Sequence, residues 1–184
     1  LERLRWLPDL GRQRFIALNI PMFTLWGWDS IPPTGAPSFG MRAIVGRALN
    51  TQTPVFVEEM QHVIFRPYWN VPRSILRNEI LPLLAREPGY LRRHEMEMVR
   101  GQDDDARAEA DTAENHALLR EGTLRLRQRP GPRNSLGLVK FVFPNDANVY
   151  LHGTPAQELF DRMFPICKLM GDTGYIRVVH SALQ

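Results

Sequence analysis

The sequence predicts a mainly β domain that carries an α-helical insertion. Short runs of large apolar residues, bounded by proline and glycine, recur over the first 65 residues and again from residue 123 onward. Between these two parts the apolar residues take helical spacing. With 184 residues, of which 43% are hydrophobic, the chain is long enough for one globular domain with a sizeable core.

The first part of the chain is predicted to be a β meander. Residues 1–8 resemble the end of a helix that Pro8 stops, and the proline-rich stretch 30–38 is typical of a turn. The β-type runs between and after these segments are expected to form strands because β-branched and aromatic residues dominate them. The expected strands are 14–20, 23–28, 41–46, 53–57 and 60–65.

The middle of the chain is predicted to be helical. Apolar residues follow Ser74 at helical spacing and continue past Pro82, and a second short helix restarts near residue 90. Residues 101–117 contain six acidic residues against one arginine, a net charge of −5. We expect this acidic segment to be a polar loop within the insertion.

The last part returns to a β pattern. Residues 123–129 alternate strictly, with leucines on one face and Arg125, Arg127 and Arg129 on the other, which predicts a half-exposed strand. Residues 139–143 and 148–152 are expected to be two further strands, followed by a short helix at 156–160.

The charge distribution leaves two interpretations open. The chain has a net charge of +3, so everything outside the acidic segment carries +8. A basic body favours an anionic polymer as partner, although solvated arginines explain it equally well. The arginine strand at 125–129 would suit an anion-binding module, but it lacks the clustered aromatics of a nucleic-acid site, so no nucleic-acid partner is expected. No apolar run reaches membrane-spanning length.

The single cysteine, Cys167, limits the chemistry. One cysteine rules out an intrachain disulfide and a multi-cysteine zinc site. It is either a small buried hydrophobe or a nucleophile. The histidines have no metal-site spacing, so neither a metal nor another cofactor is expected.

His152 is the candidate general base. It ends a predicted strand immediately before Gly153, where a rigid sheet would present an imidazole at its rim. One ring nitrogen of such a histidine can bond a backbone carbonyl, such as that of Gly153, while the other accepts a proton.

Several motifs, taken in order, resemble one enzyme family. The chain resembles the YcbB-like branch of the L,D-transpeptidases, the YkuD domain, over about residues 1–162. The motifs that carry the resemblance are ERLRWLP at 2–8, NIP at 19–21, MRAIVGR at 41–47, PYWNVPRSI at 67–75, NEILP at 78–82, PGYL at 88–91, RQRPGP at 127–132, LG at 136–137, VKF at 139–141, FPN at 143–145 and YLHGTP at 150–155.

The resemblance implies a fold and a reaction. It implies a YkuD-like β-sandwich or mixed sheet that forms a single catalytic domain over 1–184, with the helical insertion at about 73–118 as a lid. It also implies a periplasmic or cell-envelope enzyme that cross-links peptidoglycan stem peptides through an acylated cysteine and that carbapenems can acylate. The family's base matches His152, the carbonyl that orients it matches Gly153, and aromatic residues of the cleft match Trp69 and Tyr150.

The sequence departs from the family at the nucleophile. The family has an S-H-G-C motif followed by an apolar residue, arginine and valine, and the best match here is DTGYIRV at 172–178. Gly174 and Arg177 are kept, while Tyr175 occupies the place of the cysteine. Arg177 would suit a stem carboxylate.

Two hypotheses follow from this departure. In the first, Cys167 is a relocated nucleophile and the neighbouring Lys168 lowers its pKa. In the second, the domain has lost its chemistry and keeps a groove that binds stem peptides or regulates an active partner.

Overall fold

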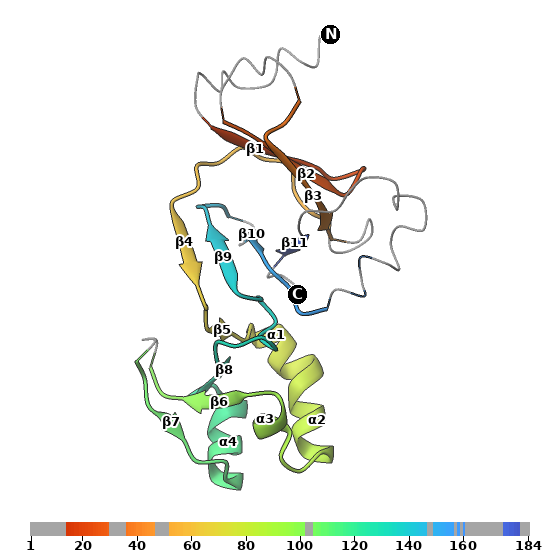
Figure 1. Ribbon diagram of the computed structural model, residues 1–184. Coiled ribbons are helices and arrows are strands. Elements are labelled where there is room, and N and C mark those ends of the chain that lie inside the picture. Colours follow the sequence, from red (N-terminus) through yellow and green to blue (C-terminus); the bar gives the residue numbers. More distant parts are fainter. Residues whose placement is uncertain are drawn as a thin grey trace.

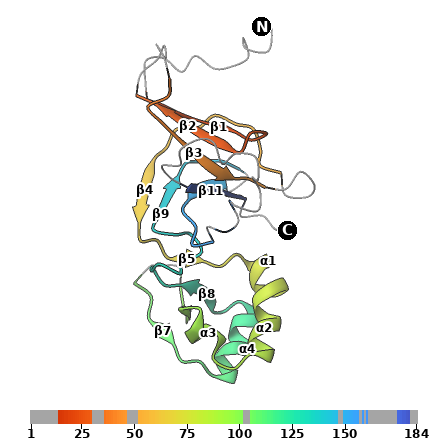
Figure 2. The ribbon, with the colours of Figure 1, turned by 45° about the vertical axis from the view of Figure 1, so that its right-hand side comes forward.

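The computed structural model describes residues 14–29, 36–46, 52–101, 105–146, 149–156, 158 and 160, together with the backbone of 175–180. The predicted helix at 1–8 lies outside these residues, and the predicted helix at 156–160 lies partly outside them. Figures 1 and 2 show two units stacked end to end, with a large sheet in one and a small sheet with the helices in the other.

The first unit is built on a seven-stranded mixed sheet. Its strand order is β1-β2-β3-β11-β10-β9-β4, and the only parallel pairing described within it joins β3 to β11. The strands are β1 (Phe15–Asn19), β2 (Thr24–Trp28), β3 (Phe39–Ile44), β4 (His62–Phe65), β9 (Val139–Val142), β10 (Val149–His152) and β11 (Tyr175–His180). The predicted mainly β fold with a mixed sheet is therefore confirmed.

The core of the large sheet lies where its central strands meet the first hairpin. Alternation along each strand points one set of apolar side chains to the same face, and these side chains pack together away from water. The buried members of this cluster are Leu25, Ala43, Val45, Val149 and Leu151. Because β10 supplies two of them, the strand that carries His152 is anchored in the core.

The second unit combines a small antiparallel sheet with short helices. The sheet has the order β5-β8-β6-β7. Its strands are β5 (Trp69–Asn70), β6 (Met96–Val99), β7 (Ala108–Glu109) and β8 (Arg125–Gln128). The helical elements are α1 (Arg73–Ile75), the π-helical turn η2 (Leu76–Ile80), α2 (Leu81–Arg86), α3 (Tyr90–Arg93) and α4 (Ala113–Glu121).

The helices cover one face of the small sheet. Met98 and Leu126 are paired across β6 and β8, so their side chains lie on the same face. They join an apolar cluster with residues of the helices, and these are Leu76, Ile80, Tyr90, Leu91 and Leu119. The second unit therefore has a hydrophobic core of its own.

Two predictions about local structure were wrong. Residues 53–57, predicted as a strand, have no regular secondary structure, and Val55 is 92% exposed because no neighbouring strand pairs with it. The acidic segment 101–117, predicted as a loop, contains β7 and the start of α4. The Thr112 side chain accepts a hydrogen bond from the Asn115 backbone N–H at 3.2 Å and begins that helix.

The two units are joined by two passages of the chain. One runs from β4 to β5 and the other from β8 to β9, and both cross between the sheets in Figure 1. Asn134, which is 0% exposed, lies in the second passage. Its side-chain amide donates to the carbonyl of Pro67 in the first passage at 3.1 Å and to the carbonyl of Arg129 at 2.9 Å. One buried side chain thus holds both passages together.

Candidate active site

His152 lies at the end of an interior strand of the large sheet. It is the last residue of β10, which lies between β9 and β11, and it is only 1% exposed. Its Nδ1 is hydrogen-bonded to the backbone carbonyl of Gly153. A carbonyl oxygen can only accept, so Nδ1 carries the proton and Nε2 is the nitrogen with the lone pair in the neutral ring. This arrangement prepares Nε2 to accept a proton.

The hairpin between β9 and β10 is held by one asparagine. The Asn145 side chain accepts from the Val149 backbone N–H at 2.8 Å and donates to the carbonyls of Val149 at 2.7 Å and Phe143 at 3.0 Å. These bonds fix the register of the two strands, in which Lys140 is the direct partner of His152. Directly opposed residues of an antiparallel pair share one face of the sheet.

An ammonium group and a tyrosine ring accompany the histidine. The Lys140 Nζ lies 4.0 Å from the centroid of the Tyr150 ring, a cation–π contact. The Tyr150 and His152 rings lie 5.7 Å apart, centroid to centroid, with an angle of 51° between their planes. Lys140 and Tyr150 are both partly exposed, whereas His152 is buried. A positive charge and an aromatic ring thus share a sheet face with the imidazole.

The other neighbour of His152 is strand β11. Across this pair His152 is the direct partner of Arg177, and β11 in turn pairs Tyr175 with Arg42 of β3. Since β10 ends at His152, the backbone of Tyr175 on β11 lies just beyond this strand end.

The comparison with known families agrees with this geometry. A family model described as the L,D-transpeptidase catalytic domain, YkuD, matches residues 14–173. The chain belongs to the YkuD family of L,D-transpeptidase catalytic domains. A Haemophilus influenzae protein described as "Putative L,D-transpeptidase" is 30% identical over 164 residues, which make up 88% of this chain and 31% of that protein. The chain therefore spans about a third of the length of this relative.

The residues predicted for the nucleophile motif lie outside the described residues or are described by their backbone alone. Cys167 and Gly174 lie outside the described residues. Tyr175 and Arg177 are described only as backbone positions of β11. The family match ends at residue 173, so Gly174, Tyr175 and Arg177 lie beyond it.

The two aromatic residues predicted for the cleft lie in different sheets. Tyr150 lies beside His152 on β10, as described above. Trp69 lies in β5 of the small sheet, where it pairs with Gln128 and packs against the apolar cluster of the second unit. The structure thus brings Tyr150, but not Trp69, onto the strand of the histidine.

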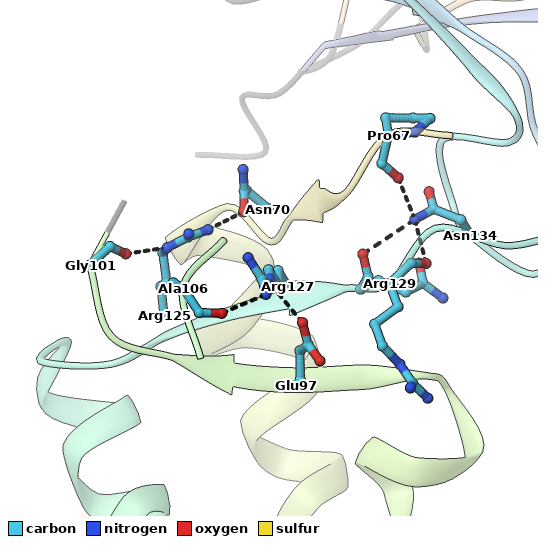
Figure 3. A network of polar contacts seen from close by, with 10 residues as sticks. Pro67, Asn70, Glu97, Gly101, Ala106, Arg125, Arg127, Arg129 and Asn134 are labelled. Carbon is cyan, nitrogen blue, oxygen red and sulfur yellow. Dashed lines mark hydrogen bonds and ion pairs between the residues drawn. The ribbon is translucent and has the colours of Figure 1, made fainter. Parts of the chain in front are cut away.

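The predicted strand is present as β8, but its arginine face is less exposed than predicted, because Arg127 is 3% exposed, while Arg125 is partly exposed and Arg129 is exposed. Arg127 on β8 donates to Glu97 Oε1 at 2.7 Å and to the Ala106 carbonyl at 2.8 Å (Figure 3). Its guanidinium also lies 4.1 Å from the centroid of the Tyr68 ring. Arg125 donates to the side-chain oxygen of Asn70 and to the carbonyl of Gly101. These bonds commit the guanidinium groups of Arg125 and Arg127 to the fold, so the three arginines do not form a continuous cationic stripe, although Arg129 is exposed.

The described residues form neither a metal-ligand cluster nor a membrane-spanning helix. Among the residues whose placement is described, no three His, Cys, Asp or Glu side chains come together as metal ligands. Within the same residues no helix is long and apolar enough to cross a membrane.

Lys140 belongs to the site but was not predicted as a site residue from the sequence. Only the register of β9 against β10 places it opposite His152.

Proposed function

We propose that this YkuD domain transfers acyl groups between peptidoglycan stem peptides in the bacterial cell envelope. His152 serves as the general base and Cys167 as the nucleophile. The observation that carries the proposal is the hydrogen bond between His152 Nδ1 and the Gly153 carbonyl. It fixes the tautomer in which Nε2 can take the proton of a thiol.

The proposed reaction has two halves. His152 Nε2 takes the proton from the thiol of Cys167, and the sulfur attacks the carbonyl carbon of the third residue of a stem peptide. The C–N bond to D-alanine breaks, and His152 returns the proton to the leaving amine, which leaves a thioester on the enzyme. An amine of a second stem then attacks the thioester, passes its proton through His152, and releases the thiol.

The surroundings of His152 suit a peptide that carries carboxylates. Lys140 supplies a positive charge, Tyr150 supplies an aromatic surface beside it, and Arg177 is in register with the histidine. We place the domain in the periplasmic, YcbB-like branch of the family. The insertion at 73–118 acts as the lid over the bound stem, and Trp69 contacts the stem at the base of that lid.

The test is covalent labelling with a carbapenem, which mimics the acyl donor. Intact mass is measured for the parent chain, Cys167→Ala, His152→Ala and the control His62→Ala. The control removes an exposed histidine of β4, an edge strand of the large sheet that lies outside both the proposed lid and the β9–β10 hairpin. We expect one adduct on the parent and on His62→Ala, none on Cys167→Ala, and slow labelling of His152→Ala. An adduct of unchanged yield on Cys167→Ala would overturn the assignment of the nucleophile.

A second function is favoured by one specific observation. Tyr175 stands where the family has its cysteine, and the family match stops two residues before it. A domain that has lost its nucleophile would still bind stem peptides through Lys140 and Tyr150, as a recognition or regulatory module. In the labelling experiment this domain would give no adduct on the parent, while calorimetry would still show binding of a stem tetrapeptide.

A further inference from the structure

Two glycines meet behind the candidate base. Gly137 lies in the turn that leads into β9, and Gly153 directly follows His152. A Cβ atom at Gly137 would lie 2.6 Å from the carbonyl carbon of Gly153, 2.8 Å from its Cα and 2.9 Å from the nitrogen of Thr154. All three are backbone atoms, so no side chain can rotate away to make room. Gly137 also has a φ of +65°, which L residues with a Cβ rarely adopt.

The atom that a side chain at Gly137 would meet first belongs to the group that orients His152. The carbon at 2.6 Å carries the carbonyl oxygen to which His152 Nδ1 is bonded. Any displacement of this carbon moves the acceptor away from the imidazole. The hydrogen bond at Nδ1 sets the tautomer and the orientation of the imidazole ring. Its loss therefore changes the protonation and the direction of Nε2.

The turn that carries Gly137 cannot move aside easily. The Gly137 backbone N–H donates to the Asn134 carbonyl at 2.8 Å, and the Leu136 N–H donates to the Asn134 side-chain oxygen at 2.8 Å. Asn134 is itself held by the bonds to Pro67 and Arg129 that join the two passages between the units, as Figure 3 shows. A methyl group at Gly137 would therefore displace Gly153 rather than its own turn.

The other side of the contact is also fixed. The Gly153 backbone N–H donates to the Val139 carbonyl at 3.0 Å, which continues the β9–β10 ladder by one residue past His152. The carbonyl of Gly153 is thus held between the end of a strand ladder and the Gly137 turn. A displacement of this carbonyl has to be absorbed at its bond to the imidazole or in the ladder.

We propose that Gly137 is a positioning residue for His152. Its missing side chain lets the Gly153 carbonyl approach closely enough to keep the proton on Nδ1 and the lone pair on Nε2. The catalytic meaning of this role rests on the proposed function, in which His152 is the base. The effect on the imidazole itself does not depend on turnover and can be measured in a domain without activity.

The test compares Gly137→Ala with a control that has the same backbone strain. Gly89 has a φ of +71°, and a Cβ there would make an ordinary contact of 3.8 Å with the flexible Arg93 guanidinium. Gly89→Ala therefore carries the cost of a positive φ, but no backbone collision and no contact with the β9–β10 hairpin. Both variants are prepared with ¹⁵N-labelled histidine, and His152 is assigned from the signals lost in His152→Ala.

The readout is the tautomer of His152 in long-range ¹H–¹⁵N spectra. We expect one tautomer with the proton on Nδ1 in the parent and in Gly89→Ala, and a loss of this single tautomer in Gly137→Ala. If the parent labels with carbapenem, Gly137→Ala should label about a hundredfold more slowly, the size expected for a misplacement near 1 Å. A folded Gly137→Ala that keeps the parent tautomer and ring shifts would overturn the proposal.

A second variant covers the case in which Gly137→Ala does not fold. A Cβ at Gly153 would lie 3.4 Å from the Gly137 Cα and 3.5 Å from the Leu138 nitrogen, so Gly153→Ala fills the gap at this contact without a collision. We expect this variant to keep the single tautomer of the parent, and loss of the tautomer without a collision at Gly137 would overturn the proposal. A parent that is never labelled would contradict the proposed function alone, because the tautomer experiment still decides the role of Gly137.

Discussion

Lys140 and His152 are direct partners across β9 and β10, and the Lys140 ammonium lies over the ring of Tyr150, two residues before the histidine. The antiparallel register therefore places a positive charge and a buried imidazole on the same sheet face. The two residues lie on the two strands of one hairpin, and the hydrogen bonds of Asn145 in its turn set them opposite each other. In the proposed function, this charge attracts a carboxylate of the stem peptide toward the imidazole.

Replacement of Lys140 by methionine should weaken the binding of anionic stem peptides. The methionine keeps the apolar stem on the Tyr150 ring but removes the charge, so the dissociation constant for a tetrapeptide with a free C-terminal carboxylate should rise about tenfold. The amidated peptide should bind parent and variant equally well. Calorimetry measures both, and an equal loss for the two peptides would show that Lys140 acts through packing and not through its charge.

Arg127 should be among the most sensitive positions for stability. Its side chain is 4% exposed and bonds Glu97, which is 17% exposed. Removal of one partner leaves a buried charge without its counter-charge, so Arg127→Met should lower the free energy of unfolding by about 3–5 kcal/mol. Urea denaturation followed by circular dichroism measures this loss. A loss below about 1 kcal/mol would mean that the pair is solvated in solution.

The Glu95–Arg133 pair offers a test of pH dependence. The bond from Arg133 Nη2 to Glu95 Oε1, 2.6 Å long, holds the pKa of Glu95 below its ordinary value, and the nearby charges of Arg133 and Arg129 add to the effect. The stabilisation is therefore complete above the ordinary pKa. It is lost as the pH falls through the lowered pKa, because the unfolded chain takes up its proton first.

Arg133→Gln should raise the pKa of Glu95 and weaken the dependence of the free energy of unfolding on pH in this range. Arg129→Gln is the matched control, since it removes only the weaker charge effect and should raise the pKa less. Carboxyl ¹³C shifts of Glu95, titrated by NMR, report both values. A pKa that is the same in the parent and in Arg133→Gln would show that the hydrogen bond is not populated.

Runs of apolar residues bounded by turn residues predicted strands correctly. Two hairpins of the large sheet, β1–β2 and β9–β10, come from such runs, and their strands lie close to the expected bounds. The run at 53–57 has the same composition, yet Val55 is exposed. A strand needs a partner, and the partner is decided by the rest of the fold.

Charge patterns gave wrong predictions for a similar reason. The acidic composition of 101–117 predicted a loop, but α4 begins within this segment because Leu119, two residues beyond it, packs in the core. The alternation at 123–129 correctly separated the leucines from the arginines. It could not show that β6 places Glu97 directly opposite Arg127, because that register joins residues 30 positions apart.

The candidate site was predicted in part. His152 at a strand end before Gly153 was visible in the sequence, and the bond between its Nδ1 and the Gly153 carbonyl is present. Lys140 and Gly137 become part of the site only through the β9–β10 register and the close approach of two backbone segments. Neither relation has a signal in the local sequence pattern.

The role of His152 as the base of acyl transfer is measured as the release of D-alanine from a purified peptidoglycan tetrapeptide fragment. The parent chain, His152→Ala and the control His62→Ala are incubated with the fragment, and free D-alanine is quantified over time. We expect release by the parent and by His62→Ala, and a rate reduced by at least about a hundredfold in His152→Ala. Equal release by His152→Ala and the parent, or no release by the parent, would contradict this role.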